Sequence, residues 1–469
     1  MKIGVVSGDG LAVSGLLTTL RSVVTLGVAD GILDLPVAIE FGFSWRPDKS
    51  AYYPAGPDML TCPAWLAVDL AVPFDDATEA ALEFSATREG VLRWEELGRP
   101  EQGALGRRIE ACAANYESRF DEFFERHFLD WVIAINMTLS DSVAVTLGLH
   151  RSAAKRWGGG RGGGILYWDH DLFGSYAVRY GGERIYPPAP NSATPTPQDE
   201  THVRWAVVSE PLLAEAQTYP GAAEAKMVPN PLPEIEDVAI EARHRSFLAS
   251  YGLEERPLVL CPVRIFRVKG VEIALELHRA MVDAFVQASL TPPVLLIFGA
   301  LDEDPEYTAD VLARCKSLGL GADTRFLDGV PLGSVQGRNG VWRLDEIDLF
   351  MLAAHTSGGV YFTPNTEDVE SVGLGPALAA EFGMPVVVTP YRAFREVYGA
   401  SFYCIMLESS TADAARAFLD LWQSLKNGDV DGRRKLEHNK RIVRTKFSGD
   451  PWRELLRAMA ASVDRVGRF

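Results

Sequence analysis

Two positively charged side chains, Arg264 and Lys269, stand five residues apart directly after an apolar run at 258–262. The run is typical of a buried strand, and Gly270 follows the second cation, so the spacing places both side chains around a strand-to-helix turn. Such a turn can direct both toward one anionic group. Arginine forms bidentate hydrogen bonds with phosphate, and lysine adds a mobile point charge. The pattern predicts a phosphate site, with a surface ion pair as the alternative.

A carboxylate and a glycine-rich turn follow another apolar run, at 359–363, and lead into an expected helix at 373–382. Small residues let the backbone approach a ligand closely, and a helix N-terminus favours an anion. With the two cations, this segment suits a diphosphate leaving group on a sugar, because fixed positive charge stabilises the negative charge that grows as the bond breaks. An exposed acidic turn is the alternative. Glu370 is a candidate catalytic residue together with Arg264 and Lys269, and the candidate ligand-binding residues here are Glu367, Ser371, Val372, Gly373 and Leu374.

A histidine between two carboxylates, Asp169-His170-Asp171, comes directly after an expected strand at 165–168. Carboxylates beside a histidine at a strand end can orient the ring and adjust its proton affinity. His170 is therefore a candidate catalytic residue and Asp171 a candidate acceptor-binding residue, with a purely structural histidine as the alternative. Three consecutive residues of an extended chain alternate between faces and cannot all converge on one ion, so we predict no metal site here.

Two further places are candidates for contact with an acceptor. Asn136 ends an expected strand at 131–136. Trp45, Arg46 and Lys49 belong to an aromatic and basic segment, which suits stacking on a sugar or binding an anionic acceptor. A structural loop is an equal alternative for that segment.

The elements that must position these residues alternate between strands and helices. In the second half of the chain, strands are expected at 257–262, 293–298, 324–327, 359–363, 385–389 and 402–406, with helices between them. The first half begins with a strand at 2–7, a small-residue loop and a helix at 16–28, and has a glycine-rich run at 158–164 that we expect to be a flexible connection. This alternation predicts α/β architecture with parallel sheets covered by helices on both faces, which bind ligands at the carboxyl ends of strands.

The composition limits the class of protein. The chain has 469 residues and a net charge of −17, which argues against nucleic acid as the main partner but allows a locally positive site. The five cysteines are scattered, so neither a disulfide framework nor a zinc site is expected. The first residues read as a strand rather than a signal peptide, and no apolar run of about eighteen residues indicates a membrane span. We expect a cytoplasmic protein without an integral membrane segment.

The motifs together resemble a known family. Arg264-x4-Lys269-Gly270, then Pro364-x5-Glu370-x2-Gly373, then Gly383-x-Pro385-Val-Val, looks like the donor half of a retaining GT-B glycosyltransferase of family GT4. The motifs cover roughly residues 258–390, with weaker similarity elsewhere. The resemblance implies two Rossmann-like, doubly wound parallel-sheet domains that face each other across a cleft.

Prolines around Asn230 mark a stiff linker, near which we place the domain boundary. Residues 1–235 are then an N-terminal, acceptor-side domain, and residues 236–447 a C-terminal domain that binds the nucleotide-sugar donor. By the resemblance, the helix within 448–469 packs back on the N-terminal domain.

The resemblance implies a metal-independent enzyme without a cofactor. It would move a hexosyl unit, with anomeric retention, from a nucleotide sugar of the UDP-glucose or GDP-mannose type to a small hydroxylated acceptor, either an osmolyte precursor or a secondary metabolite. A homo-oligomer is compatible with it. The alternatives are a catalytically silent subunit that binds a nucleotide sugar, and a sugar phosphorylase or epimerase on the same fold.

The resemblance also implies roles for individual residues. Glu370 would bind the donor sugar, with Glu367 as the competing candidate, and His170 would contact that sugar and the reacting centre. Gly15 matches a glycine loop beside the diphosphate. The second glutamate of the family pattern, which usually binds the ribose, is replaced by Leu378, and Glu381 is a possible substitute. We expect Asn230 to be structural and Arg267 to be exposed.

Overall fold

The computed structural model describes residues 1–7, 15–40, 42, 63–69, 87, 89–138, 143–174, 179–180, 183–184, 189–233, 235, 239–337, 340–365, 370–408 and 410–464. The predicted site residues Trp45, Arg46, Lys49 and Glu367 lie outside these ranges. The chain divides into two compact units, each described here by itself. Unit 1 comprises Met1–Leu11, Arg21–Asn230 and Gly449–Phe469, and unit 2 comprises Ala12–Leu20 and Pro231–Ser448.

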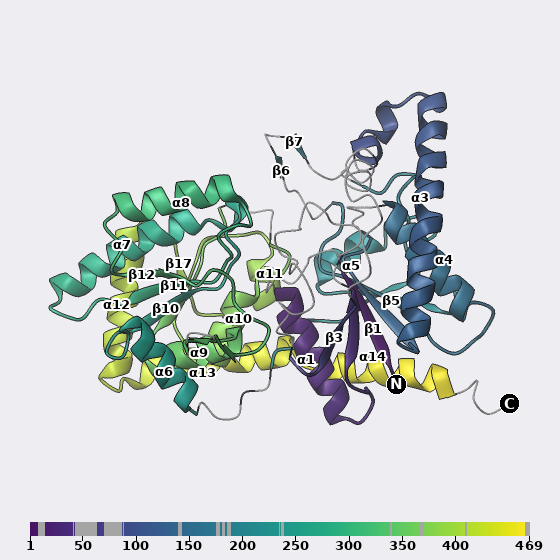
Figure 1. Ribbon diagram of the computed structural model, residues 1–469. Coiled ribbons are helices and arrows are strands. Elements are labelled where there is room, and N and C mark those ends of the chain that lie inside the picture. The colour runs from purple at the N-terminus through teal and green to yellow at the C-terminus, as the bar shows by residue number, and fades with distance from the viewer. Residues whose placement is uncertain are drawn as a thin grey trace. The chain divides into compact units, whose positions relative to one another are not determined.

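Unit 1 is built on a parallel sheet of seven strands in the order β3-β2-β1-β4-β5-β8-β9 (Figure 1). Every residue of β1, β4 and β5 is buried, because a parallel sheet covered on both faces needs apolar side chains on both. The strand order changes direction between β1 and β4. The strands are β1 (Ile3–Ser7), β2 (Val37–Glu40), β3 (Leu66–Val68), β4 (Trp131–Ile135), β5 (Gly164–Asp169), β8 (Val203–Val207) and β9 (Ala225–Met227).

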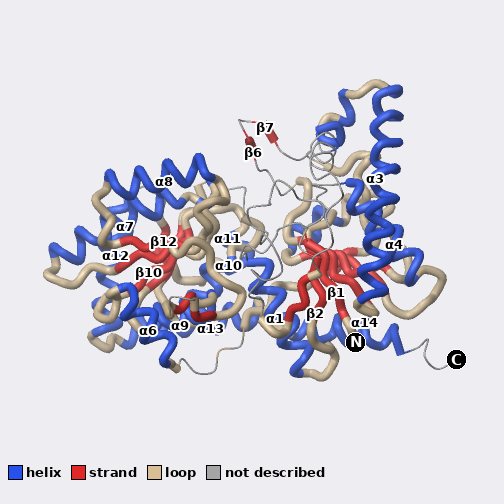
Figure 2. Tube along the Cα trace, viewed as in Figure 1, coloured by secondary structure: helices blue, strands red, loops and turns tan. Residues whose placement is uncertain are grey.

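Helices cover the sheet of unit 1, and a short hairpin stands apart from it (Figure 2). The long helix α3 packs on α4 across Gly148, where a Cβ would lie 2.7 Å from Tyr116 Cβ. The elements are α1 (Gly15–Ala29), of which the part from Arg21 belongs to unit 1, η3 (Trp94–Glu96), α3 (Arg99–Arg126), α4 (Val143–Trp157), the β6 (Arg179–Tyr180) and β7 (Glu183–Arg184) hairpin, α5 (Glu210–Ala216) and α14 (Asp450–Asp464).

The C-terminal helix α14 is part of unit 1. Trp452 Nε1 donates a hydrogen bond to the Pro229 carbonyl at 3.1 Å, and Trp131 Nε1 of β4 donates to the Met459 carbonyl at the same distance. Two tryptophan rings therefore fix α14 to the core of unit 1, with their polar N–H groups satisfied.

The glycine-rich run before β5 differs in part from the predicted flexible connection. Gly164 is the first residue of β5, and Gly163 has φ +104°. A Cβ at Gly163 would lie 2.1 Å from the Asp130 carbonyl oxygen. Glycine is required here because the backbone is tightly packed at the start of the strand.

Unit 2 is built on a parallel sheet of six strands in the order β12-β11-β10-β15-β16-β17, and the order changes direction between β10 and β15. The predicted alternation of strands and helices is observed in this unit. The strands are β10 (Leu258–Cys261), β11 (Val294–Ile297), β12 (Thr324–Phe326), β15 (Gly359–Phe362), β16 (Val386–Val388) and β17 (Ile405–Met406).

Among the helices of unit 2, α7 packs on α8 and α12, and α13 packs on α10, α11 and α12. The elements are α6 (Ala242–Tyr251), η4 (Arg267–Lys269), α7 (Val271–Gln287), α8 (Pro305–Ser317), the β13 (Val335–Gln336) and β14 (Trp342–Arg343) hairpin, α9 (Glu346–His355), α10 (Leu374–Glu381), α11 (Phe394–Tyr398), α12 (Thr411–Lys426) and α13 (Val430–Lys446). Within the described ranges of the whole chain, no helix has the length and hydropathy that a bilayer crossing requires.

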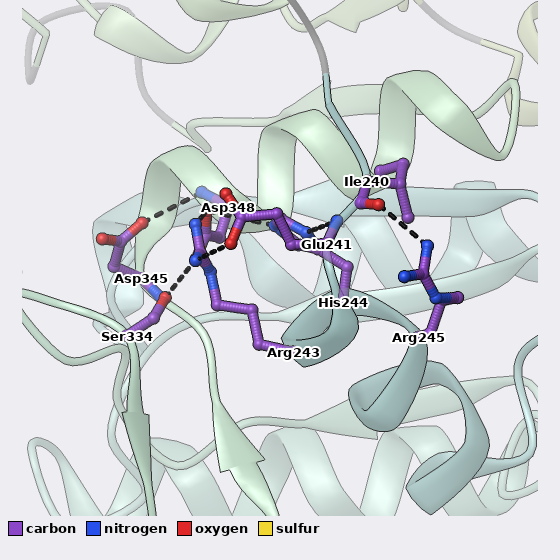
Figure 3. Close-up of polar contacts among 8 residues, drawn as sticks. All are labelled: Ile240, Glu241, Arg243, His244, Arg245, Ser334, Asp345 and Asp348. Carbon is purple, nitrogen blue, oxygen red and sulfur yellow. Dashed lines mark hydrogen bonds and ion pairs between the residues drawn. The ribbon is translucent and has the colours of Figure 1, made fainter.

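Polar contacts hold α6, a helix that the sequence analysis did not predict (Figure 3). Arg243 donates two hydrogen bonds to Asp348 of α9, from Nε at 2.7 Å and from Nη2 at 3.1 Å. Ser334 Oγ also donates to Asp348, and His244 Nε2 lies 3.1 Å from it. Burial would raise the pKa of Asp348, but these hydrogen bonds and the adjacent charges lower it below its ordinary value. The network is internal to unit 2 and anchors α6 to α9.

Candidate functional site

The two motif segments of the sequence meet at the carboxyl edge of the unit 2 sheet. Thr363 Oγ1, after β15, donates a hydrogen bond to the Gly270 carbonyl at 3.1 Å, and the Asn365 amide N donates to the Val268 carbonyl at 3.2 Å. Gly270 has φ +62°, and a Cβ there would lie 1.9 Å from the Thr363 backbone carbonyl oxygen, so only glycine fits. The segments follow β10 and β15, between which the strand order reverses. Doubly wound sheets bind ligands at such a switch point.

The structure pairs two of the predicted site residues, Lys269 and Glu370. Lys269 Nζ lies 2.5 Å from Glu370 Oε1, and the two side chains are 25% and 11% exposed. Lys269 ends the short helix η4, and Gly270 turns the chain into α7 behind it. The arrangement presents a half-buried ammonium group next to a carboxylate that can accept hydrogen bonds from hydroxyl groups.

The other predicted cation, Arg264, contacts a carboxylate that the sequence analysis did not select. Arg264 Nη2 forms an ion pair with Glu303, whose side chain is 3% exposed. Glu303 comes from the loop between β11 and α8, the neighbouring strand connection on the same edge of the sheet. Arg267, between the two cations, is 56% exposed and pairs with Asp310, as expected of a surface residue.

The glycine-rich turn before α10 is fixed by two buried tyrosines that the sequence analysis also missed. Tyr391 Oη donates to the Val372 carbonyl at 2.9 Å, and Tyr398 Oη donates to the Gly373 carbonyl. Burial raises the pKa of both phenols, so they remain hydrogen-bond donors. Gly373 has φ +70°, and a Cβ there would lie 2.5 Å from Tyr391 Oη. Leu374 begins α10, so the predicted turn residues Ser371 to Leu374 do lie at a helix N-terminus.

Neither Leu378, which replaces the second glutamate of the family pattern, nor Glu381, its possible substitute, supplies a carboxylate to a ligand. Leu378 is buried in α10. Glu381 is also buried and accepts hydrogen bonds from Arg444 of α13, from Nε at 3.1 Å and from Nη2 at 2.7 Å, with Lys440 Nζ 3.8 Å away. Glu381 therefore joins α10 to α13, which corrects the expectation that it substitutes in ribose binding.

At the carboxyl edge of the unit 1 sheet, the structure brings three predicted residues together. The His170 backbone N donates to Asn136 Oδ1 at 2.8 Å, and Asn136 Nδ2 donates to Asp171 Oδ2 at 3.3 Å. Asn136 has φ +53°, a conformation that asparagine tolerates better than most residues, and it directly follows β4 beside the switch point of this sheet.

The His170 ring is nearly enclosed, and its described contacts include a side-chain amide and an indole ring. Its Nε2 lies 3.0 Å from Asn230 Oδ1, which accepts the ring N–H, and its centroid lies 4.6 Å from that of Trp168. Asn230, expected to be structural, thus fixes the tautomer and orientation of the predicted catalytic histidine. Gly15 is the first residue of α1, and the small-residue loop before it lies outside the described residues.

The side chains of Asp169 and His170 lie on opposite sides of the chain, because successive side chains alternate along β5 and its end. Its carboxylate is fully buried and accepts a hydrogen bond from Trp205 Nε1 at 2.7 Å. Burial raises the pKa of Asp169 to about 7. This carboxyl group belongs to the core of unit 1, and a neutral acid there removes the cost of a buried charge.

Comparison of the sequence with protein-family models gives no match, and comparison with curated proteins gives none. Comparison of the structure gives matches to solved structures over nearly the whole chain. A glycosyltransferase from Rickettsia africae ESF-5 matches with a TM-score of 0.53 and 13% identity, over 98% of this chain and 99% of that one. Sucrose-phosphate synthase from Thermosynechococcus elongatus matches with a TM-score of 0.54 and 14% identity, over 100% and 98%.

A third match is HepE of Anabaena in complex with UDP and glucose, with a TM-score of 0.53 and 13% identity, over 98% of this chain and 100% of that one. At these identities the likeness concerns the fold alone. The two helix-covered parallel sheets and the near-complete coverage define the GT-B fold, so the predicted fold class is confirmed. The fold is also that of the glycosyltransferases that the sequence motifs resemble.

Proposed function

We propose that this protein is a retaining glycosyltransferase that moves a hexosyl unit from a nucleotide sugar to a small hydroxylated acceptor. The observation that carries the proposal is the pairing of Lys269 with Glu370 beside the N-terminus of α10, where the unit 2 sheet reverses its strand order. HepE, which shares the fold, was solved with UDP-glucose. Cation, carboxylate and helix N-terminus together suit a sugar diphosphate better than a neutral ligand.

In this proposal, unit 2 binds the donor, with the diphosphate near Lys269 and Arg264 and the sugar hydroxyls on Glu370. When the diphosphate enters, Lys269 exchanges part of its contact with Glu370 for a phosphate oxygen, which frees Glu370 to accept hydrogen bonds from the sugar. Both cations then stabilise the negative charge that develops on the leaving group.

The reaction itself breaks the bond between the anomeric carbon and a phosphate oxygen and forms a bond from that carbon to the acceptor oxygen on the same face. The acceptor proton passes to the departing phosphate oxygen. Unit 1 supplies the acceptor side, with His170 at the reacting sugar and Asn136 and Asp171 around it. No step requires a metal ion, so turnover is expected to persist in excess EDTA. Loss of turnover that Mg²⁺ or Mn²⁺ restores would contradict this expectation.

A second candidate function is a catalytically silent subunit that binds a nucleotide sugar. The observation that favours it is the burial of Leu378 and Glu381, which leaves the ribose without the carboxylate of the family pattern. The presence of Arg264 and Lys269 favours the enzyme, because bond cleavage needs cations that stabilise the charge growing on the leaving group, in addition to binding it.

The test is a panel of UDP-, GDP- and ADP-sugars, measured first by thermal shift and then by release of nucleoside diphosphate with and without added acceptors. Lys269→Ala should abolish most of the release, whereas Lys316→Ala, at an exposed position of α8, should leave it unchanged. Binding without release under every condition would favour the silent subunit. Turnover only with inorganic phosphate would identify a phosphorylase, and no response to any donor would refute the proposed function.

A further inference from the structure

The loop from Phe298 to Asp304 carries Glu303 and is fixed against the segment that carries Arg264. A Cβ at Gly299 would lie 2.2 Å from the backbone N of Ile265. The start of the loop therefore lies directly on the backbone that follows β10, a contact that requires glycine.

Further hydrogen bonds hold the loop from the neighbouring strand connection. The Leu301 amide N donates to Asp328 Oδ1 at 3.0 Å, and the Gly329 amide N donates to the Gly299 carbonyl at 3.3 Å. Asp328 and Gly329 follow β12, so three adjacent strand ends of unit 2 are joined here.

The other end of the loop is fixed where α8 begins. Asp304 caps the helix by accepting a hydrogen bond from the Tyr307 amide N at 3.0 Å. The Tyr307 hydroxyl in turn accepts a hydrogen bond from the Val271 amide N at 3.0 Å and donates to Glu272, both at the start of α7. Because both ends are fixed, Glu303 cannot move away from Arg264 without disturbing α7 or α8.

Burial makes the contact between Glu303 and Arg264 durable. Both carboxylate oxygens of Glu303 are enclosed by protein, and the side chain is 3% exposed, whereas that of Arg264 is 26% exposed. Removing the cation would leave a buried carboxylate uncompensated, which is far costlier than breaking an exposed pair. Arg264 must therefore keep this contact when a ligand binds. A guanidinium group has five N–H donors in a planar fork, so it can serve a carboxylate and a phosphate at the same time.

We propose that Glu303 is the positioning residue for Arg264: it holds one edge of the guanidinium group so that the accessible part is oriented toward the diphosphate of the donor. This inference rests on the proposed function and adds to it a residue from a third strand connection. Lys269 differs, because its partner Glu370 is itself a candidate sugar ligand and the ammonium group has no fixed orientation to preserve.

The test compares the affinity of UDP with that of uridine, by calorimetry, in single and double variants; GDP with guanosine and ADP with adenosine are measured in the same way. Glu303→Ala should weaken nucleoside diphosphate binding about tenfold, because Arg264 loses its buried ion-pair partner and with it its orientation. Glu303→Gln keeps an acceptor oxygen in place and should weaken nucleoside diphosphate binding less than Glu303→Ala does. Affinity for the nucleoside should stay unchanged in both variants.

The decisive measurement uses Arg264→Ala as the background. Because Glu303 acts through Arg264, adding Glu303→Ala to Arg264→Ala should cause no further loss of nucleoside diphosphate affinity. Glu306→Gln, at an exposed position in the first turn of α8, is the matched control and should bind like the unmodified chain. Melting temperatures identify any variant that fails to fold. If Glu303→Ala does not fold, Glu303→Gln takes its place in both the single-variant and the double-variant measurement.

Three outcomes would overturn the inference: nucleoside diphosphate binding that is unchanged or tighter in Glu303→Ala, equal weakening of the nucleoside, or an undiminished further loss in the Arg264→Ala background. Each of them leaves the proposed function intact if Arg264→Ala alone weakens the nucleoside diphosphate. If Arg264→Ala has no effect on any of the three nucleoside diphosphates, the phosphate site of the proposed function is refuted instead.

Discussion

At the carboxyl edge of the unit 2 sheet, Lys269 and Arg264 each contact a carboxylate, whereas at the same edge of the unit 1 sheet His170 is held by two asparagines and an indole ring. Both edges lie beside a reversal of strand order. A cation that contacts a carboxylate can still bind a ligand anion, by partial exchange as proposed for Lys269 or alongside the carboxylate as proposed for Arg264. Neutral hydrogen bonds fix the tautomer and direction of a ring without competing for charge. Under the proposed function, the ion pairs of unit 2 suit the binding of an anion, and the described contacts of His170 in unit 1 suit the orientation of its ring.

The largest expected effect tests the carboxyl edge of the unit 2 sheet, called here the charged edge because it carries Arg264, Lys269 and their carboxylate partners. Arg264→Ala and Lys269→Ala should each lower kcat by on the order of 10²–10³, because each removes a group that stabilises charge in the transition state. The fold-decrease in kcat of the double variant should be far smaller than the product of the two single fold-decreases, since both side chains serve one leaving group. Release of nucleoside diphosphate under saturating donor measures this.

Glu370→Gln is the matched change on the carboxylate side of the same edge. It should weaken the intact donor while leaving free nucleoside diphosphate bound at least as well, because Lys269 no longer has a competing carboxylate. If Glu370→Gln loses nucleoside diphosphate affinity as badly as Arg264→Ala, the division of labour between phosphate and sugar is wrong. If neither cation variant alters binding or turnover, this edge is ordinary surface.

The sequence was sufficient to predict the parts of the charged edge that follow from chain order. Strand, cation, glycine and helix lie in one short stretch around Lys269, so local spacing places them. Glu303 could not be found in this way. In the sequence it belongs to an acidic run before Pro305 that reads as an exposed helix start, and Asp304 does cap α8. The contacts that place Glu303 inward, such as the close packing of Gly299 on Ile265 and the hydrogen bond of Leu301 to Asp328, join segments that are distant in the sequence.

Residues remote in sequence explain the other differences. Glu381 was a possible substitute for the second glutamate from its place in the sequence, but its partner Arg444 is 63 residues away on α13. Asn230 lies in a proline-rich linker, where a structural role was the natural expectation, and its contact with His170 spans 60 residues. Such pairings depend on how helices and strands pack, which local patterns do not encode.

A smaller effect separates charges that bind ligands from charges that stabilise unit 2. Asp348→Ala removes the partner of Arg243 and His244, and should lower the free energy of unfolding by about 3 kcal/mol because the carboxylate is buried. Asp310→Ala breaks an exposed pair with Arg267 and should cost about 0.5 kcal/mol or less. Urea unfolding measures both. A change in UDP affinity in Asp348→Ala at temperatures where it is folded would mean that the network also serves the ligand site.

The carboxyl edge of the unit 1 sheet is tested at Asn136. Two substitutions there distinguish the role of its backbone conformation from the role of its side-chain hydrogen bonds. Both Asn136→Gly and Asn136→Ala remove the hydrogen bonds to His170 and Asp171, so both should lower kcat while nucleoside diphosphate affinity stays unchanged. Glycine accepts the positive φ, whereas alanine should cost a further ~1 kcal/mol of stability. Wild-type kcat in Asn136→Gly with several acceptors would show that the orientation of His170 does not matter for the reaction.

The last contrast is between two buried titratable groups, one in each unit. Burial raises the pKa of Asp169 from its ordinary 3.8 to about 7, and burial lowers the pKa of His278 from 6.5 to about 4. Asp169 contributes stability that is fully present below pH 3.8 and is lost as the pH rises through about 7. His278 contributes stability that is present above pH 6.5 and is lost as the pH falls toward about 4.

Between about pH 4.5 and 6.5 the two groups therefore act with opposite sign, each by at most ~1.4 kcal/mol per pH unit, and largely cancel in the unmodified chain. Asp169→Asn keeps an acceptor for Trp205 and should make stability rise with pH relative to the unmodified chain. His278→Gln keeps a donor for the Asp323 carbonyl and should make it fall. Urea unfolding at several pH values distinguishes these slopes, and parallel curves for all three chains would mean that neither group changes its protonation on unfolding in this range.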